Sequence, residues 1–314
     1  MRSFLTVIFA TFISSVFCQN ISIQPEWKVG ETKMIITYSE NTEYSGEDEP
    51  YTRMDTTEGP AILVVEEDDD NYYVQVEVED QNLMMLNSLI RTYEVDIDTE
   101  EKVKVKISVS KSGKGWTIAN FEEVKSILEG KLDKVNAAMG EKNPQMKELM
   151  VSYLEPVSSG VKSQDAMKFT FLREIEYLFL PFQRSWEEGK MYTDSATGPN
   201  PMNPAINATF TYNNVLSSVN KKENIAILEQ ETLVDMEGFI KLIKEKLQQM
   251  AELMDKPEKG EEFDNVVMNM SNQLKLEVNM KTGWVETAIG EITIEGSFPG
   301  ESKKTVSKVR KVLE

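Results

Sequence analysis

The side chains that carry most enzyme chemistry are scarce in this sequence of 314 residues. It contains no histidine, and its only cysteine is Cys18. A histidine base, a histidine-dependent triad and a histidine-ligated metal are therefore excluded. The Gly-x-Ser-x-Gly elbow and the Gly-x-x-x-x-Gly-Lys-Ser/Thr phosphate loop are also absent. Ser110–Gly115 resembles a glycine-rich loop only loosely, and its place between a predicted strand and Trp116 favours a hairpin turn.

Carboxylates are the remaining candidates for catalysis or metal binding. A pair of them could hydrolyse a glycosidic bond, but none of the 53 acidic residues stands in a distinctive apolar, glycine-rich context. The run Glu66–Asp70 offers oxygen ligands for calcium. However, adjacent side chains diverge, and the run lacks the alternating spacing of an EF-hand loop, so a solvated turn is favoured. We therefore expect no enzyme, no catalytic residue, no metal ligand and no cofactor.

Aromatic and methionine side chains suggest binding rather than catalysis. Trp27, Trp116, Trp186 and Trp284 could stack on a sugar or line an apolar cavity, although their matched positions favour roles in the core. Methionine-rich helices could face an apolar ligand, or could fill an irregular core. The methionines in question are Met84, Met85, Met139, Met146, Met150, Met250 and Met254. No individual ligand-binding residue can be assigned from these patterns.

The chain is strongly acidic, with a formal net charge of −19 at pH 7. Such a surface repels phosphate backbones and anionic headgroups, so nucleic acid is excluded as a partner and docking on anionic lipid is disfavoured. Hydrophobic residues make up 40% of the sequence, which is too much for a disordered acidic tail and enough to bury a sizeable core.

Residues 1–18 have the pattern of a secretory signal peptide. A positive charge at Arg2 precedes the largely apolar stretch 4–17, which is shorter than a membrane-spanning helix, and no later stretch is long and apolar enough to span. Cleavage after Cys18 would leave a chain without cysteine or disulfide. The alternative is a lipid anchor on Cys18, which the bulky Phe17 disfavours. We expect an exported protein, periplasmic or extracellular.

Three glycosylation motifs, at Asn20, Asn207 and Asn269, would matter only in a eukaryotic secretory pathway.

Three landmarks recur in the same order in the two parts of the chain, which predicts an internal duplication. The matched segments are residues 27–30 with 186–189, residues 71–76 with 224–228, and residues 115–116 with 283–284. The first pair shares Trp-x-x-Gly, the second opens a strand at Asn, and the third shares Gly-Trp.

Hydrophobic periodicity predicts the elements within each part. Predicted strands cover residues 33–44, 61–65, 72–78, 103–109, 207–218, 224–234, 273–295 (a hairpin) and 305–313. Predicted helices cover 120–139, 144–156 and 238–255, while 167–182 fits either period and is assigned to a helix broken at Pro181. Asn120 and Glu123 form a capping-box pattern.

These elements predict an α+β protein of two related halves. Each half is a mainly antiparallel sheet covered on one face by amphipathic helices. The predicted boundaries are 1–18 for the signal peptide, 19–160 for the first half, 161–185 for a helical linker and 186–314 for the second half.

The Gln19-Asn20 start after an apolar leader, the Trp-x-x-Gly openings and the hairpin 278–284 with its Thr-Gly-Trp turn resemble a group of uncharacterised secreted proteins of Gram-negative bacteria that carry a domain of unknown function. The fold expected here is also similar, at the level of layers, to periplasmic lipoprotein-carrier proteins. Neither resemblance transfers an activity or a functional residue.

The expected function is non-catalytic binding by an exported protein. Its ligand would be an apolar or amphipathic small molecule, or its partner a protein of the envelope. Two alternatives remain: a structural or interaction protein of the envelope without a ligand cavity, and a carboxylate-based hydrolase.

Overall fold

The computed structural model describes residues 20–45, 49–78, 81–92, 103–142, 154, 157–200, 203–253, 267–298 and 301–314. The predicted signal peptide, Cys18 and the predicted helix 144–156, apart from residue 154, lie outside the described residues.

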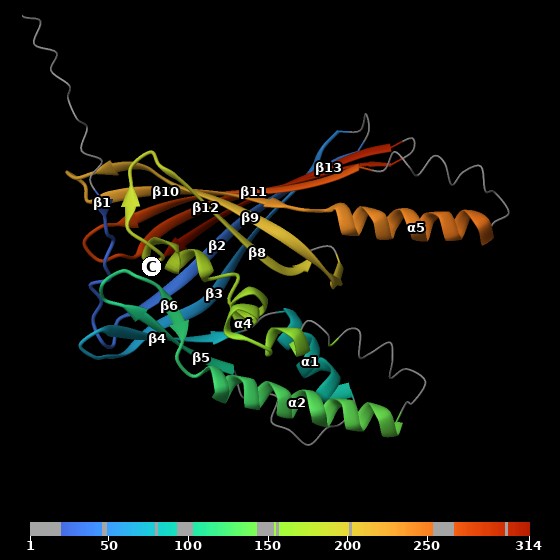
Figure 1. The fold of residues 1–314 in the computed structure, drawn as a ribbon, viewed down its shortest axis with the longest axis horizontal. Helices are drawn as coiled ribbons and strands as arrows, with labels where there is room; N and C mark the ends of the chain where they lie inside the picture. The colour runs from blue at the N-terminus through green and yellow to red at the C-terminus, as the bar shows by residue number, and fades with distance from the viewer. Residues whose placement is uncertain are drawn as a thin grey trace, which may run out of the picture.

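Eleven strands form one antiparallel sheet in the order β6-β5-β4-β3-β2-β13-β12-β11-β10-β9-β8 (Figure 1). The strands of the first part of the chain are β2 (Thr32–Ser45), β3 (Tyr51–Glu67), β4 (Asn71–Val78), β5 (Val103–Ser110) and β6 (Trp116–Ile118). Those of the second part are β8 (Met191–Asn200), β9 (Asn203–Asn220), β10 (Ile225–Val234), β11 (Val267–Asn279), β12 (Val285–Phe298) and β13 (Glu301–Leu313). A separate two-stranded sheet pairs β1 (Asn20–Ile21) with β7 (Trp186–Glu187). The protein is therefore a mixed α+β fold with mostly antiparallel strands.

The last strand joins the two sets of strands into one sheet. β13 pairs with β2 from Lys303 opposite Ser45 to Leu313 opposite Ile35. The sequence predicts a sheet in each half, whereas the structure has a single open sheet, because β13 satisfies the backbone donors and acceptors that β2 and β12 would otherwise leave at an edge.

The same order of elements occurs twice along the chain: three strands, a helix and two strands. In the first part these are β2, β3, β4, α1 (Gln81–Thr92), β5 and β6, and in the second β8, β9, β10, α5 (Glu237–Leu253), β11 and β12. Glycines at matched landmarks adopt positive φ angles, 88° at Gly30 and 77° at Gly189, and 96° at Gly115 and 75° at Gly283. These turns need glycine because other residues are strained in that region.

Helical segments cover one face of the sheet, which is called the inner face here and carries Ile35, Ile62, Val76, Val105 and Leu276. Helices α1, α2 (Phe121–Lys142) and α4 (Gln164–Phe171) lie beside the strands of the first part, while α5 extends beyond the end of the sheet (Figure 1). In the segment 167–182 the helix ends at Phe171, earlier than the predicted break at Pro181, and Pro181 lies within the 3-10 turn η2 (Glu176–Phe182). The described residues include no helix that is long and apolar enough to cross a membrane.

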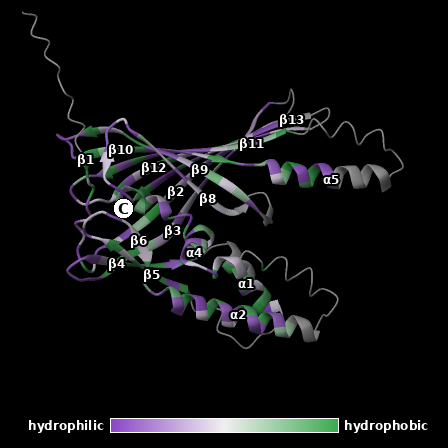
Figure 2. Cartoon of the chain, in the orientation of Figure 1, coloured by the Kyte–Doolittle hydropathy of each residue, from purple (hydrophilic) through white to green (hydrophobic). Residues whose placement is uncertain are grey.

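The core lies between the inner face and these helical segments. Strand β4 alternates buried and half-buried residues, with Val74, Val76 and Val78 pointing inward as predicted. Helix α2 contributes the buried stripe that its period predicts, including Val124 and Leu128. Figure 2 shows hydrophobic and hydrophilic residues interspersed along the strands and along α2. A smaller cluster of Met236, Met268 and Met270 packs with residues of α5.

The predicted capping residue Asn120 has a different role. Its side-chain oxygen accepts the backbone N–H of Lys106 at 2.8 Å, and its side-chain amide donates to the carbonyl of Lys104 at 3.0 Å and to Glu123 Oε2 at 3.4 Å. The Asn120 side chain therefore joins the start of α2 to strand β5 by hydrogen bonds.

Candidate functional site

A cavity of about 630 Å³ lies on the sheet between the central strands and the segment that contains α4. Its apolar lining residues are Met34, Pro60, Ala61, Val76, Val78, Phe171, Leu172, Ile175 and Val309. The other lining residues are Thr37, Thr57, Glu58, Gly59, Glu77, Glu174 and Lys311. A mainly apolar concavity with a few polar groups is typical of a small-molecule site, and its volume falls in the usual range.

Strand register determines which lining residues present side chains to the cavity. Thr37 lies opposite both Thr57 and Lys311, and it shares the inner face with Ile35. Glu58 lies opposite Ile36, and Glu77 lies between the inward-facing valines of β4. Because successive strand residues point to opposite faces, the Glu58 and Glu77 carboxylates point to the outer face. Lys311 is therefore the charged strand side chain on the cavity side. The side chains of Met34 and Ala61, which pair with each other and are exposed, point to the outer face for the same reason, so the inward apolar wall consists of the other apolar lining residues.

The Lys311 ammonium is fixed by groups of the covering segment. Its Nζ donates to the backbone carbonyl of Glu174 at 2.8 Å and lies 5.2 Å from the ring centroid of Tyr177. Burial lowers the pKa of Lys311, and the nearby Glu174 carboxylate partly opposes this effect. Burial also raises the pKa of the Tyr177 hydroxyl above its usual range, so it stays protonated at neutral pH.

Polar side chains also lie on the inner face at β8, β9 and β10, which β11 and β12 separate from the strands that line the cavity. Arg184 forms an ion pair with Asp194, whose carboxylate also accepts from the Asn214 amide at 3.2 Å. Gln230 donates in turn to Asn214 Oδ1 at 2.8 Å. The Nε atom of Arg184 is buried and has no hydrogen-bond partner among the described residues. Since the other contacts join neighbouring strands, we interpret the network as structural support for this part of the sheet.

A half-buried carboxyl, that of Glu176, stands at the start of η2. Burial raises the pKa of Glu176, and the positive charges of Lys168 and Arg173 act in the opposite direction. Burial together with the Glu176 charge raises the pKa of Tyr212 to about 12. The protonated form of each group is thus favoured in the folded state.

The raised pKa of Glu176 leads to a prediction about stability. A raised folded-state pKa contributes stability that is present at pH below the usual carboxyl range and is lost as pH rises through the folded value. Glu176→Gln removes this ionisation, so we expect a higher urea midpoint than wild type at pH 7. The difference should shrink towards pH 4. Glu174→Gln, which alters an exposed carboxylate of the same segment, is the control. An equal effect of Glu176→Gln at both pH values would contradict the prediction.

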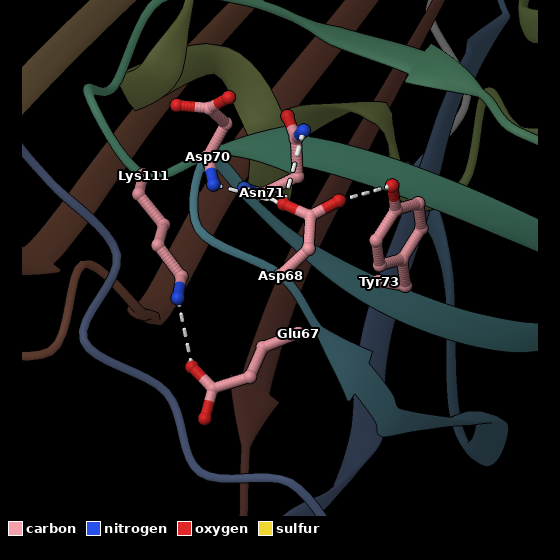
Figure 3. Close-up of polar contacts among 6 residues, drawn as sticks. All are labelled: Glu67, Asp68, Asp70, Asn71, Tyr73 and Lys111. Carbon is pink, nitrogen blue, oxygen red and sulfur yellow. Dashed lines mark hydrogen bonds and ion pairs between the residues drawn. The ribbon is translucent and has the colours of Figure 1, made fainter.

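The hairpin turn predicted between residues 66 and 71 is present but shorter: it spans residues 68–70, because Glu66 and Glu67 belong to β3 and Asn71 begins β4 (Figure 3). Asp68 Oδ1 accepts the backbone N–H groups of Asp70 at 2.9 Å and Asn71 at 2.7 Å. Asp68 Oδ2 accepts the Tyr73 hydroxyl at 2.7 Å, and these bonds, that from Tyr73 foremost, lower the pKa of Asp68. The Asp68 carboxylate therefore stabilises the turn through these hydrogen bonds.

Neighbouring carboxylates at the end of β3 are paired with lysines of β5 and the turn that follows it. Glu66 is paired with Lys106, and Glu67 is paired with Lys111 at 2.9 Å. These partners compete with any cation for the same oxygen atoms. In the part of the chain that the structure describes, no group of three or more acidic, histidine or cysteine residues is placed to hold a metal ion.

The tryptophans occupy core positions, as the sequence predicts. All four are buried, and Trp27 stacks on Trp284 with ring centroids 4.2 Å apart. Met84, by contrast, is 64% exposed and is not among the residues that line the cavity. The side chains of the other helical methionines named above lie outside the described residues.

Sequence reasoning named no ligand-binding residue and missed Lys311. The available signal was weak: Lys311 falls between Val309 and Leu313 in a period-two pattern, which places a lysine on a face with two apolar residues. The competing apolar residues Val306 and Val312 obscure that pattern. The covering segment, which is distant in sequence, completes the site.

Comparison with known proteins provides no assignment. No protein-family model matches the chain, and no curated protein matches it. A solved structure with a weak likeness is OmpTdeltaL8, a loop L8 deletion mutant of OmpT, an outer membrane protein of Vibrio cholerae. The likeness covers 91% of this chain and 100% of that chain at 8% sequence identity, with a TM-score of 0.23. A TM-score this low supports no argument about fold or function.

Proposed function

We propose that this protein is a non-catalytic binding protein for an apolar or amphipathic small ligand, held between the sheet and the segment 164–182. The observation that carries the proposal is the cavity of about 630 Å³, with an apolar lining and Lys311 on its sheet side. Apolar walls supply affinity by removing ligand surface from water, and a small number of polar groups set its orientation.

The arrangement of carboxylates favours binding over hydrolysis. A glycosidase needs two carboxyl groups facing each other across roughly 5 to 10 Å. Of the acidic residues that line the cavity, Glu58 and Glu77 belong to the outer face by register, and Glu174 is exposed. The residues that remain on the cavity side can bind and orient a ligand.

We further propose that the protein is exported and acts in the periplasm or outside the cell. The signal-peptide pattern of residues 1–18 supports this location. A structural or interaction role in the envelope remains the alternative. Exposed apolar residues of the central strands, such as Tyr38, Met54 and Ile289, favour a protein partner in that case.

The two parts of the chain are proposed to be related by duplication, which would explain how one long sheet arose. The repeated element order and the matched positive-φ glycines support this relation. β13 is the additional strand that joins the second copy to the first.

Filling the cavity tests the proposed function. Val309 lines the cavity from β13, and Val309→Trp should occupy its space and weaken binding of the uncharged dye Nile red at least tenfold. Val306→Trp is the matched control, because Val306 lies on the same strand but faces Thr42 and Thr293 on the outer face. Fluorescence titration of folded variants gives the affinities. Equal binding by wild type and Val309→Trp, or no binding by wild type, would refute the proposal.

A further inference from the structure

We propose that Lys311 makes this cavity selective for an anionic amphiphile, with a carboxylate head on the Lys311 ammonium and an apolar chain along the lining. This inference rests on the proposed binding function and adds the chemical class of the ligand. The inference concerns only the head group of the ligand, so an experiment can refute it while the cavity is still found to bind apolar molecules.

The first argument is the unusual position of the lysine. Lys311 is half-buried on the sheet, and even partial removal of an ammonium from water is costly unless a partner compensates for it. Within the described residues, the contacts of the Lys311 ammonium are a backbone carbonyl and an aromatic ring, and it forms no ion pair within 4.0 Å. An ammonium has three donors, and the Glu174 carbonyl uses one of them. The remaining donors can meet a ligand oxygen.

The second argument is the chemistry of the neighbours on the same face. Lys311 lies opposite Thr37 on β2 and opposite Ala288 on β12, while Val309 and Leu313 flank it along β13. Thr37 also lines the cavity and provides a hydroxyl donor next to the ammonium. Apolar residues of β4 and α4 complete the wall. One charged group among apolar surfaces matches a ligand with one charged end.

The third argument concerns the net charge of −19, which would seem to repel an anion. Charges on the outer surface are screened over about 8 Å at physiological salt. A contact inside a partly enclosed cavity is screened much less, so the adjacent ammonium dominates the local interaction. The acidic strand residues nearest the cavity, Glu58 and Glu77, point to the outer face by register. Glu174 is exposed and can turn its carboxylate into solvent.

Two ligands of equal chain length and different heads test this inference. Dodecanoate and dodecanol, used below their aggregation limits, would each displace Nile red from the wild-type protein. Since a hydrogen bond to a charged group is worth a factor of roughly ten to one hundred, dodecanoate should bind at least tenfold more tightly. Lys311→Met, which keeps an unbranched chain and removes the charge, should abolish this preference and leave dodecanol binding within about twofold.

The control variant is Lys308→Met, because Lys308 lies on the same strand and faces Glu40 and Glu291 on the outer face. It should retain the wild-type preference. Lys311→Gln provides a second test if Lys311→Met does not fold, and the wild-type comparison of the two heads needs no variant. Equal binding of both amphiphiles by wild type, or a preference that survives both Lys311 substitutions, would overturn the head-group inference and leave the proposed function intact. Binding of neither amphiphile would overturn both.

Discussion

Replacing Gly113 by alanine is expected to lower the free energy of unfolding by about 3 kcal/mol, more than most single substitutions do. Gly113 has a φ angle of 68°, which L side chains rarely adopt. A Cβ atom there would also lie 2.2 Å from the backbone oxygen of Ile23, whose side chain is buried in the core. The strand-connecting turn and the segment around residue 23 cannot both keep their positions. Urea denaturation followed by tryptophan fluorescence would measure the loss.

Gly30→Ala is the matched control for this prediction. Gly30 has a φ angle of 88°, but no atom lies within 4 Å of an added Cβ. Its substitution should cost about 1 to 2 kcal/mol from backbone strain alone. If both variants lose equal stability, the close approach of residues 23 and 113 is not a constraint on the fold.

Trp186→Ala is expected to have the other largest effect, a loss of about 4 kcal/mol. The Trp186 side chain has 0% exposure, and its ring packs against Tyr192 with centroids 5.6 Å apart. Its backbone pairs with Ile21 in the small sheet, so the residue connects the start of the described chain to the second part. Removing the ring leaves a large cavity that rigid neighbours fill only in part. The same urea experiment would show the loss, and a change below about 1 kcal/mol would contradict it.

Phenylalanine substitutions at Trp186 and Trp27 distinguish the contribution of the indole hydrogen bond to stability from that of ring packing. Trp186 Nε1 donates to the carbonyl of Pro181 at 3.0 Å, whereas the buried Nε1 of Trp27 has no partner among the described residues. Trp186→Phe should therefore cost about 1 kcal/mol more than Trp27→Phe, because only the former leaves a buried carbonyl unsatisfied. The reverse order would show that ring volume outweighs the hydrogen bond.

Local patterns in the sequence predict much of the secondary structure. The alternation Val74, Val76 and Val78 places β4 with one buried face, and the stripe that includes Val124 and Leu128 places α2. The prediction for 167–182 is less accurate, since α4 ends at Phe171 and η2 contains Pro181. There, apolar residues are buried on every side, so neither helical nor strand periodicity describes the segment well.

The candidate site is less predictable from sequence than the elements around it. Lys311, Val76 and Leu172 are far apart along the chain, and they line the same cavity because strand pairing and the fold of the covering segment bring them together. A lysine in a strand is ordinarily a solvent-exposed residue, so its type and spacing alone do not predict a half-buried cation beside a cavity. The tryptophans, which suggested a binding surface, instead fill the core.

The sequence by itself determined the reactive side chains present, the acidic charge and most strands and helices, because composition and short-range periodicity are local properties. Only the tertiary structure decided that one sheet contains both sets of strands and that Lys311 lies beside an apolar cavity. Both outcomes depend on the pairing of β13 with β2, whose residues are more than 250 positions apart. Such long-range hydrogen bonding follows from which edges and apolar faces remain to be covered after the local elements form.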